Sequence, residues 1–490
     1  MRFFNLIVLL ILGSLPQRDI FCQISNNAET IEVRLVDLID RVIEFHPLVK
    51  SANLEINKGS AEVLKARGAF DPTIAFQQNQ KNFDNINYYQ VQTFSLESPT
   101  RSGVKVQLGT ENSTGQYLNP MDNTGKVGTQ YTGFSIPILK DLIIDKKRAD
   151  FQKSKTLKTM NYWEREIIIN NLLNDLIQHY IEWQIWTESS NRIEQMIFNA
   201  ETRQNGLRKL FRAGASNTVD TLETYVQLEQ YRAKLMEIQW KQLKSKIMIN
   251  SWLWAEDNTP IELTQNSIPS RWGLEQLDSF CNYSFNYFTN GSSSINAPLP
   301  PELRLLENTI SLTKIDLNYK TNNLLPQLDL KYQYLQPLNN FNYADFGNLR
   351  NNNRFGIQFS SPLVYREARG EYQLAKYKYQ QTEWKFQSKQ REFFIKIQAN
   401  FNEISVSRNL YSKWVEIGTE LTDLYNLEIR RFEAGDANFF IVNTREMRAL
   451  DAQLKALEYR KEYFQYCNHF LNYTGWYTVL FSEKITSATK

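Results

Sequence analysis

The sequence reads FRAGASN at Phe211–Asn217 and FEAGDAN at Phe432–Asn438, two copies of one short pattern. Each copy stands inside a long window without proline, 138–259 or 363–490. Proline is strongly disfavoured inside helices, so both windows can hold uninterrupted helix. The glycine at the centre of each copy predicts a tight turn between two antiparallel helices.

The segments that flank these turns are longer than ordinary globular helices. The first outgoing segment, Asp141–Arg212, has 72 residues and would measure about 108 Å at ~1.5 Å per residue. Its return segment, Ser216–Trp254, matches that length only if the N-terminal helical stretch Ala28–Gly68 stacks end to end with it. The second half offers the same two shorter segments, Pro300–Asn323 and Asp436–Thr474. Such lengths indicate an extended coiled coil or tube.

Further landmarks recur in the same order in both halves, which indicates a duplicated architecture. FSIPILKDL surrounds Pro137 and FSSPLVYRE surrounds Pro362. The prediction is a signal segment, a first repeat of helix, two strands and long helical hairpin, a connector, a second repeat and a tail. Their ranges are 1–22, 23–256, 257–299, 300–475 and 476–490.

Between the helical segments the hydrophobic period changes to two, which is typical of strands with one apolar face. Two such stretches occur in each half, at 104–108, 131–136, 328–334 and 355–359. In one interpretation they form a small soluble sheet. In the other, the apolar face meets lipid and the polar face lines the water-filled lumen of a membrane barrel. Four strands cannot close around a pore alone, so the barrel requires several chains.

The first 22 residues are predicted to be a secretion signal. Arg2 is followed by an apolar stretch to Leu12, and Gly13 then breaks the pattern. That stretch is short for a membrane anchor, and no later one approaches eighteen apolar residues. Cleavage after Cys22 and lipidation of Cys22 are the two alternatives for processing. In either case we expect an exported protein.

Composition argues against several classes of function. Lys and Arg number 56 against 53 Asp and Glu, a net charge of +3, so nucleic acid is not an expected partner. The three histidines are scattered without the spacing of metal ligands, and no phosphate-binding glycine loop occurs. We therefore predict no catalytic residues, no metal, no cofactor and no enzyme activity.

The chain resembles the TolC-like outer membrane efflux and secretion channels of Gram-negative bacteria. The resemblance rests on the duplication, on the strand–helix junctions at Pro137 and Pro362, and on the two turns with the helices that follow them. It implies a mainly α protein with a membrane β-barrel portion. Three chains of four strands each would form one twelve-stranded barrel, continued by a periplasmic α-helical coiled-coil tube. The implied partners are a periplasmic adaptor, an inner-membrane pump and outer-membrane lipid.

By the same resemblance, the turns form the periplasmic tip where the adaptor docks. The tip residues are Phe211, Gly214, Asn217, Asp220, Phe432, Gly435 and Asn438. The family often places an acid six residues after the glycine, and Asp220 meets this in the first half. The second half has Ile441 there, and Thr444 three residues later. Candidates for a pore constriction are therefore Asp220 and an apolar pair, Phe439 and Phe440, which would gate by excluding water.

The predicted function is the outer-membrane channel of a tripartite efflux or type I secretion system, a passive conduit docked to an adaptor and a pump. The alternative is an exported, soluble coiled-coil adaptor or structural protein. An exported hydrolase is a third candidate, and the residues for it are missing from the sequence.

Overall fold

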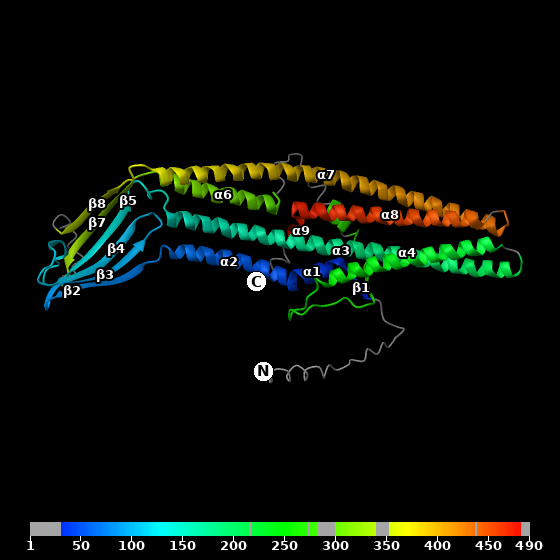
Figure 1. Ribbon diagram of the computed structural model, residues 1–490, viewed down its shortest axis with the longest axis horizontal. Coiled ribbons are helices and arrows are strands. Elements are labelled where there is room, and N and C mark those ends of the chain that lie inside the picture. The colour runs from blue at the N-terminus through cyan, green and yellow to red at the C-terminus, as the bar shows by residue number, and fades with distance from the viewer. Residues whose placement is uncertain are drawn as a thin grey trace, which may run out of the picture.

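The computed structural model describes residues 31–214, 217–271, 274–275, 277–282, 299–339, 352–436 and 439–481. Figure 1 shows an elongated molecule with a β-sheet at one end, helices along its length and two helical turns at the other end. The predicted signal segment, including Cys22, lies outside the described residues.

Two helices run from the sheet to the opposite end. α3 (Lys146–Arg212) has 67 residues and α7 (Arg366–Glu433) has 68, so each extends about 100 Å. The chain returns through a turn as α4 (Thr218–Asn250) after α3, and as α8 (Phe439–Thr474) after α7. Both predicted helical hairpins are thus observed, at equivalent places in the two halves (Figure 1).

Shorter helices complete the length of each hairpin. α2 (Pro47–Gly68) packs on the part of α3 nearest the sheet, where the Asn161 side chain donates to the Glu55 carbonyl at 3.1 Å. α6 (Pro301–Asn322) packs against α3 and α7. Figure 1 shows α2 and α4 along α3, and α6 and α8 along α7, which is the predicted end-to-end stacking.

The sequence predicted one helical stretch over Ala28–Gly68. The structure instead has a short strand followed by two helices there. Strand β1 (Ile31–Val33) pairs in parallel with β6 (Ser267–Pro269) of the connector. α1 (Leu35–Phe45) then ends at His46, whose backbone is extended, and Pro47 starts α2. The pyrrolidine ring of a proline disfavours helical geometry at the residue before it, so the helix breaks here.

The sheet contains six antiparallel strands in the order β2-β3-β4-β5-β7-β8. The first half supplies four of them and the second half two, so the prediction of two strands per half is wrong for the first half. The bounds are β2 Thr73–Phe83, β3 Ile86–Pro99, β4 Lys105–Thr114, β5 Thr129–Pro137, β7 Gln327–Pro337 and β8 Asn353–Ser360.

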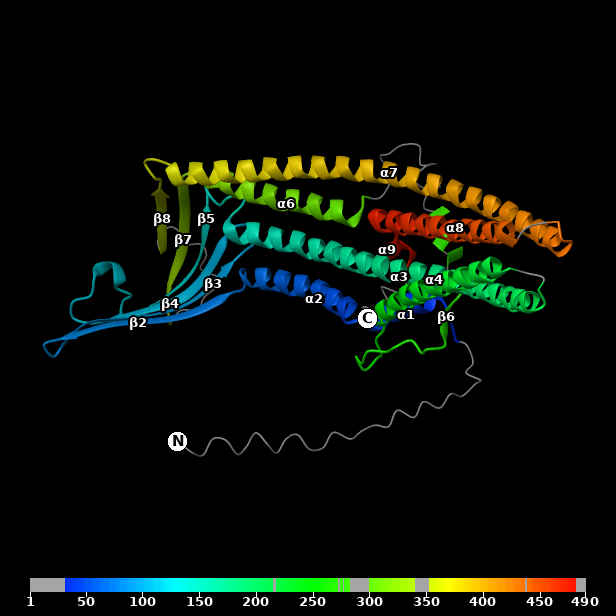
Figure 2. The same cartoon turned by 45° about the vertical axis from the view of Figure 1, so that its right-hand side comes forward.

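The hairpin that the sequence did not reveal is formed by β2 and β3. Its two-residue turn is Asp84-Asn85, and both residues have positive φ (53° and 56°), as the tight hairpin turn requires. The register shifts between Lys81 and Asn82, and residues 77–82 of β2 are all Gln, Asn or Lys. Such a polar segment has no alternation of apolar and polar residues by which a strand could be predicted. Figure 2 shows this hairpin extending away from the other strands.

The main hydrophobic core lies midway along the helices, where α1, α3, α8 and the connector meet. Trp183 and Tyr180 of α3 are fully buried there, and the Tyr180 hydroxyl donates to the Val33 carbonyl at 3.0 Å. α9 (Trp476–Leu480), at the start of the predicted tail, packs into the same core. Within the described ranges, no helix has the length and hydropathy needed to cross a membrane.

Candidate functional site

The two turns at the helical end have the same local geometry. Gly214 and Gly435 have φ of +78° and +83°, in the left-handed region that favours glycine. Their N–H groups donate to the carbonyls of Phe211 and Phe432, each at 3.0 Å. After the second turn, the N–H of Asp436 also reaches back to a carbonyl of the last helical turn, which completes a Schellman cap. The sequence pattern therefore identified both turns and their glycines.

The polar residues predicted at the first turn act as a helix cap. The Asn217 side chain accepts the backbone N–H of Asp220 at 2.8 Å, which satisfies one unpaired donor at the start of α4. Asp220 is half-buried in the first turn of α4, where its charge is favourable to the helix dipole. Asn438, the matching position in the second half, lies outside the described residues.

The aromatic residues of the second turn differ in exposure. The Phe439 ring packs against the Phe432 ring, with centroids 5.7 Å apart, and Phe439 is 3% exposed. Phe440 is 57% exposed. Phe439 therefore holds the two ends of the turn together, and Phe440 is the one of this pair that presents an apolar surface. Phe211, at the first turn, is also exposed.

A buried carboxylate joins all four long helices near the turns. Glu446 of α8 is fully buried and accepts hydrogen bonds from Tyr425 of α7 at 3.0 Å and from Gln227 and Tyr231 of α4 at 3.1 and 3.3 Å. The Arg203 guanidinium of α3 completes the set with an ion pair to Glu446. We call these five residues the Glu446 cluster.

The surroundings of the cluster shift the ionisation of its members. Burial, with the nearby carboxylate, raises the pKa of Tyr425 to about 12. Burial opposes the charge of Arg203, and the bond to Glu446 outweighs it and raises the guanidinium pKa. The sequence analysis missed this cluster. The sequence feature that could have revealed it is an acid at a helical core position: Glu446 has the spacing of the buried residues Val442 and Ala449 of α8.

The sheet presents an apolar face and a polar face across all six strands. Ile74 lies opposite Leu96, Val106 opposite Phe134 and Leu330 opposite Ile357. The registers of the six strands place all these side chains on one face. Nine large hydrophobic residues of this face are between 37% and 70% exposed. They are Ile74, Phe76, Phe94, Val106, Leu108, Phe134, Phe355, Ile357 and Phe359. We call them the apolar band.

The opposite face carries charges and amides. The Arg354 guanidinium donates to both carboxylate oxygens of Glu111, at 3.1 and 2.8 Å, and reaches the Gln333 amide oxygen at 3.3 Å. A Cβ on Gly109 would meet the Tyr131 ring at 2.5 Å, so the glycine lets that ring lie flat across the polar face. The predicted alternation is therefore present in the structure.

No protein-family profile and no curated protein matches this sequence. Solved structures do match it. The CmeC outer membrane channel of Campylobacter jejuni has a TM-score of 0.61 at 12% identity, covering 96% of this chain and 94% of that chain. The outer membrane protein VceC of Vibrio cholerae has a TM-score of 0.60 at 13% identity, covering 90% and 96%. The open state of the MtrE outer membrane channel of Neisseria gonorrhoeae has 0.57 at 12% identity, covering 90% and 89%.

This chain has the TolC-like channel fold. The resemblance stated from the sequence is thereby confirmed at the level of the fold, across nearly the whole described chain.

The TolC-like chain passes from strand to helix at the two predicted prolines. Pro137 ends β5, and the next residue donates its N–H to the Leu328 carbonyl at 2.7 Å, which ties this junction to β7. Asp145 then caps α3 by accepting the N–H of Arg148 at 2.7 Å. Pro362 stands exposed between β8 and α7. Both prolines therefore occupy junctions.

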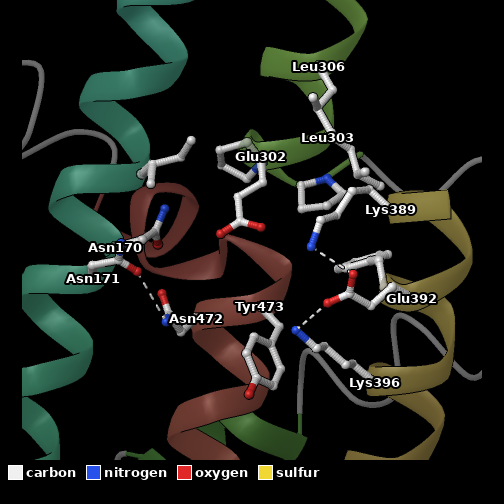
Figure 3. Close-up of a pocket in the computed structure, with 14 residues that line it drawn as sticks. Asn170, Asn171, Glu302, Leu303, Leu306, Lys389, Glu392, Lys396, Asn472 and Tyr473 are labelled. Atoms are coloured by element: carbon white, nitrogen blue, oxygen red, sulfur yellow. Dashed lines mark hydrogen bonds and ion pairs between the residues drawn. The ribbon is translucent and has the colours of Figure 1, made fainter. Parts of the chain in front are cut away.

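A pocket of the TolC-like chain lies where α3, α6, α7 and α8 come together (Figure 3). Lys389 and Lys396 both pair with Glu392, at 2.7 and 2.9 Å, and these hydrogen bonds lower the carboxyl pKa of Glu392 to about 2. Figure 3 shows Glu302, from the start of α6, pointing into the same space. The two lysine ammonium groups are thus balanced by the carboxylates of Glu392 and Glu302. Such neutral charge pairing is typical of contacts between packed helices. In the described part of the chain, no group of three or more His, Cys, Asp or Glu residues is arranged to hold a metal ion.

Proposed function

We propose that this protein is the outer-membrane channel of a tripartite export system in a Gram-negative bacterium. The observation that carries the proposal is the apolar band. Nine large hydrophobic side chains lie exposed on one face of a sheet whose other face carries Arg354, Glu111 and Gln333. Contact with lipid would cover the apolar face, and water in the lumen would solvate the polar face. Along every strand of a membrane barrel, side chains alternate between these two environments.

The channel is proposed to be a homotrimer. β2 and β8 are the two edges of the sheet, and they run in opposite directions. In a ring of identical chains, β8 of one copy can therefore pair with β2 of the next and continue the antiparallel order. A closed ring pairs the backbone N–H and C=O groups of every edge strand, which is required where the surroundings are hydrocarbon. Because each chain has six strands, three chains would make eighteen, in place of the twelve that the resemblance implied.

The helical end is proposed to be the periplasmic tip. α3 and α7 extend about 100 Å away from the sheet, so the turns lie far from the outer membrane. Phe211 is exposed at the first turn, where it offers apolar surface to a periplasmic adaptor. Phe440 is exposed at the second turn, where its ring is proposed to narrow the pore by excluding water. An inner-membrane pump bound through that adaptor would supply the energy and select the cargo. The chain itself would be a passive conduit.

The alternative is an exported, soluble adaptor with the same helical hairpins. It requires another surface to cover the apolar band, because monomeric soluble proteins rarely expose so large a patch. Subcellular fractionation separates the two functions. We expect the full-length protein to stay with the outer membrane after a carbonate wash and to run as a heat-sensitive trimer in detergent. A monodisperse protein that is soluble without detergent would overturn the proposal.

A further inference from the structure

Two cysteines far apart in the sequence meet inside the main core. Cys281 lies in the helical residues 277–282 of the connector, and Cys467 lies in α8. Their exposures are 1% and 0%, and both belong to the same hydrophobic cluster. Both side chains are thiols in this structure; burial raises the pKa of the Cys467 thiol, and the Cys281 thiol lies close enough to add to this effect.

Neighbouring contacts fix the two helices in this register. The Tyr463 hydroxyl of α8 donates to the carboxylate of Asp278 in the connector. Cys281 follows Asp278 by three residues and Cys467 follows Tyr463 by four, which is about one helical turn in each case. Each cysteine thus lies about one turn along its helix from the Tyr463–Asp278 contact, and both side chains belong to the same buried cluster. A polar contact thus aligns the same two segments that carry the thiols.

We propose that Cys281 and Cys467 form a disulfide in the exported protein, joining the connector to α8. The proposal rests on the export that is part of the proposed function, because disulfides persist in the periplasm and are rare in the cytosol. It adds a covalent link between the connector and the second repeat. The loop closed by this bond contains α6, β7, β8 and α7, so the link would hold the whole second repeat against the connector.

The oxidant is a protein disulfide of a thiol oxidase. One cysteine thiolate attacks that disulfide and forms a mixed disulfide, releasing one oxidase thiol. The second cysteine thiolate then attacks the mixed disulfide, which forms the Cys281–Cys467 bond and releases the other oxidase thiol. The chain loses two electrons and two protons, and the oxidase takes up both.

The reaction belongs to the folding stage. Burial, with the adjacent Cys281 thiol, raises the pKa of the Cys467 thiol, so the folded core disfavours the thiolate that must attack. Access for an oxidase is also closed, since both side chains are buried. The bond would therefore form before this core closes, and it would then be shielded from reduction.

The test uses the full-length chain, exported with its own leader and purified from membranes after free thiols are blocked with N-ethylmaleimide. We expect a peptide containing both Cys281 and Cys467 in a non-reduced digest, and its loss in Cys281→Ser and in Cys467→Ser. The midpoint of thermal unfolding should fall by several degrees when the wild type is reduced, and the double serine variant should not respond. Peptide identification keeps Cys22 from confusing the result.

Two negative outcomes are distinguishable. Membrane-bound protein with N-ethylmaleimide on both Cys281 and Cys467 would overturn the disulfide and leave the proposed function intact. Recovery of the chain in the cytoplasm would overturn the proposed function, and the disulfide with it. If both serine variants fail to fold, the peptide map of the wild type decides the matter alone. A host without its periplasmic thiol oxidase provides the matched control, in which both thiols should be alkylated after denaturation.

Discussion

The guanidinium of Arg203 in α3 forms an ion pair with the fully buried carboxylate of Glu446 in α8, which joins the first helical hairpin to the second. Three further donors from α4 and α7 reach the same carboxylate. The two hairpins are therefore connected near the turns by a charge that has no access to water. One carboxylate thus links α3 and α4 of the first hairpin to α7 and α8 of the second.

Arg203→Met should loosen the helical end. The substitution leaves the Glu446 carboxylate buried without its cation, and breaking a buried pair in this way costs about 3 kcal/mol. Hydrogen–deuterium exchange should show faster local opening of α3 and α8 around the cluster. Arg232→Met is the matched control, because Arg232 bridges α3 and α4 through exposed ion pairs and should have little effect. Equal exchange in both variants would contradict this role of Glu446.

Gly214→Ala should destabilise the first turn by roughly 1–2 kcal/mol, because its φ of +78° places a side chain in the left-handed region. Gly206→Ala is the control, within the helix α3 that precedes the turn. Gly206 is helical and open space surrounds it, so alanine there should stabilise α3 by roughly 0.5–1 kcal/mol. Exchange protection of the turn measures both effects. The prediction fails if the two substitutions have the same sign.

Stability should fall as the pH drops below about 6.5, in part through His46. Its Nδ1 accepts the backbone N–H of Leu48 at 3.1 Å and caps α2, and burial lowers the imidazole pKa. The unfolded chain therefore binds a proton at a pH where the folded chain does not, and the free energy of unfolding decreases.

His46→Asn should flatten this pH dependence, because asparagine keeps a cap acceptor that does not titrate. Burial also lowers the pKa of His469, but His469 contributes equally to both proteins, so their difference isolates His46. Thermal unfolding of the two proteins between pH 7.5 and 5 measures it. Parallel profiles would exclude His46 as the source.

Ile357→Lys should reduce the amount of trimer in carbonate-washed outer membrane. Ile357 belongs to the apolar band, and a lysine facing lipid near the midplane costs about 2–4 kcal/mol. Gln358→Lys changes the next residue of the same strand, on the polar face, and should leave the yield unchanged. Similar yields from both variants would argue that lipid does not contact the band.

Phe440→Ala should raise the resting conductance of purified trimers in planar bilayers several-fold, if the exposed Phe440 ring narrows the tip by excluding water. Phe211→Ala removes a similarly exposed ring from the first turn and should leave the conductance near that of the wild type. Unchanged conductance in Phe440→Ala trimers that remain folded would remove Phe440 from the gate.

The sequence by itself determined the features that depend on neighbouring residues. Missing prolines allow the two helices of about 100 Å, Gly214 and Gly435 permit the turns, and a period of two marks β7 and β8. Each of these follows from local backbone and side-chain preferences, which a short window of sequence contains. The duplication followed because the same local signals occur twice in the same order.

Only the tertiary structure decided which distant residues meet. Glu446 resembles any helical acid until α3, α4 and α7 surround it, and Cys281 approaches Cys467 only because the connector folds onto α8. The strand count also depended on it, since β2 and β3 are recognised by their pairing with each other and with β4. Pairings of this kind depend on the three-dimensional arrangement of segments, and no local preference of the residues involved specifies them.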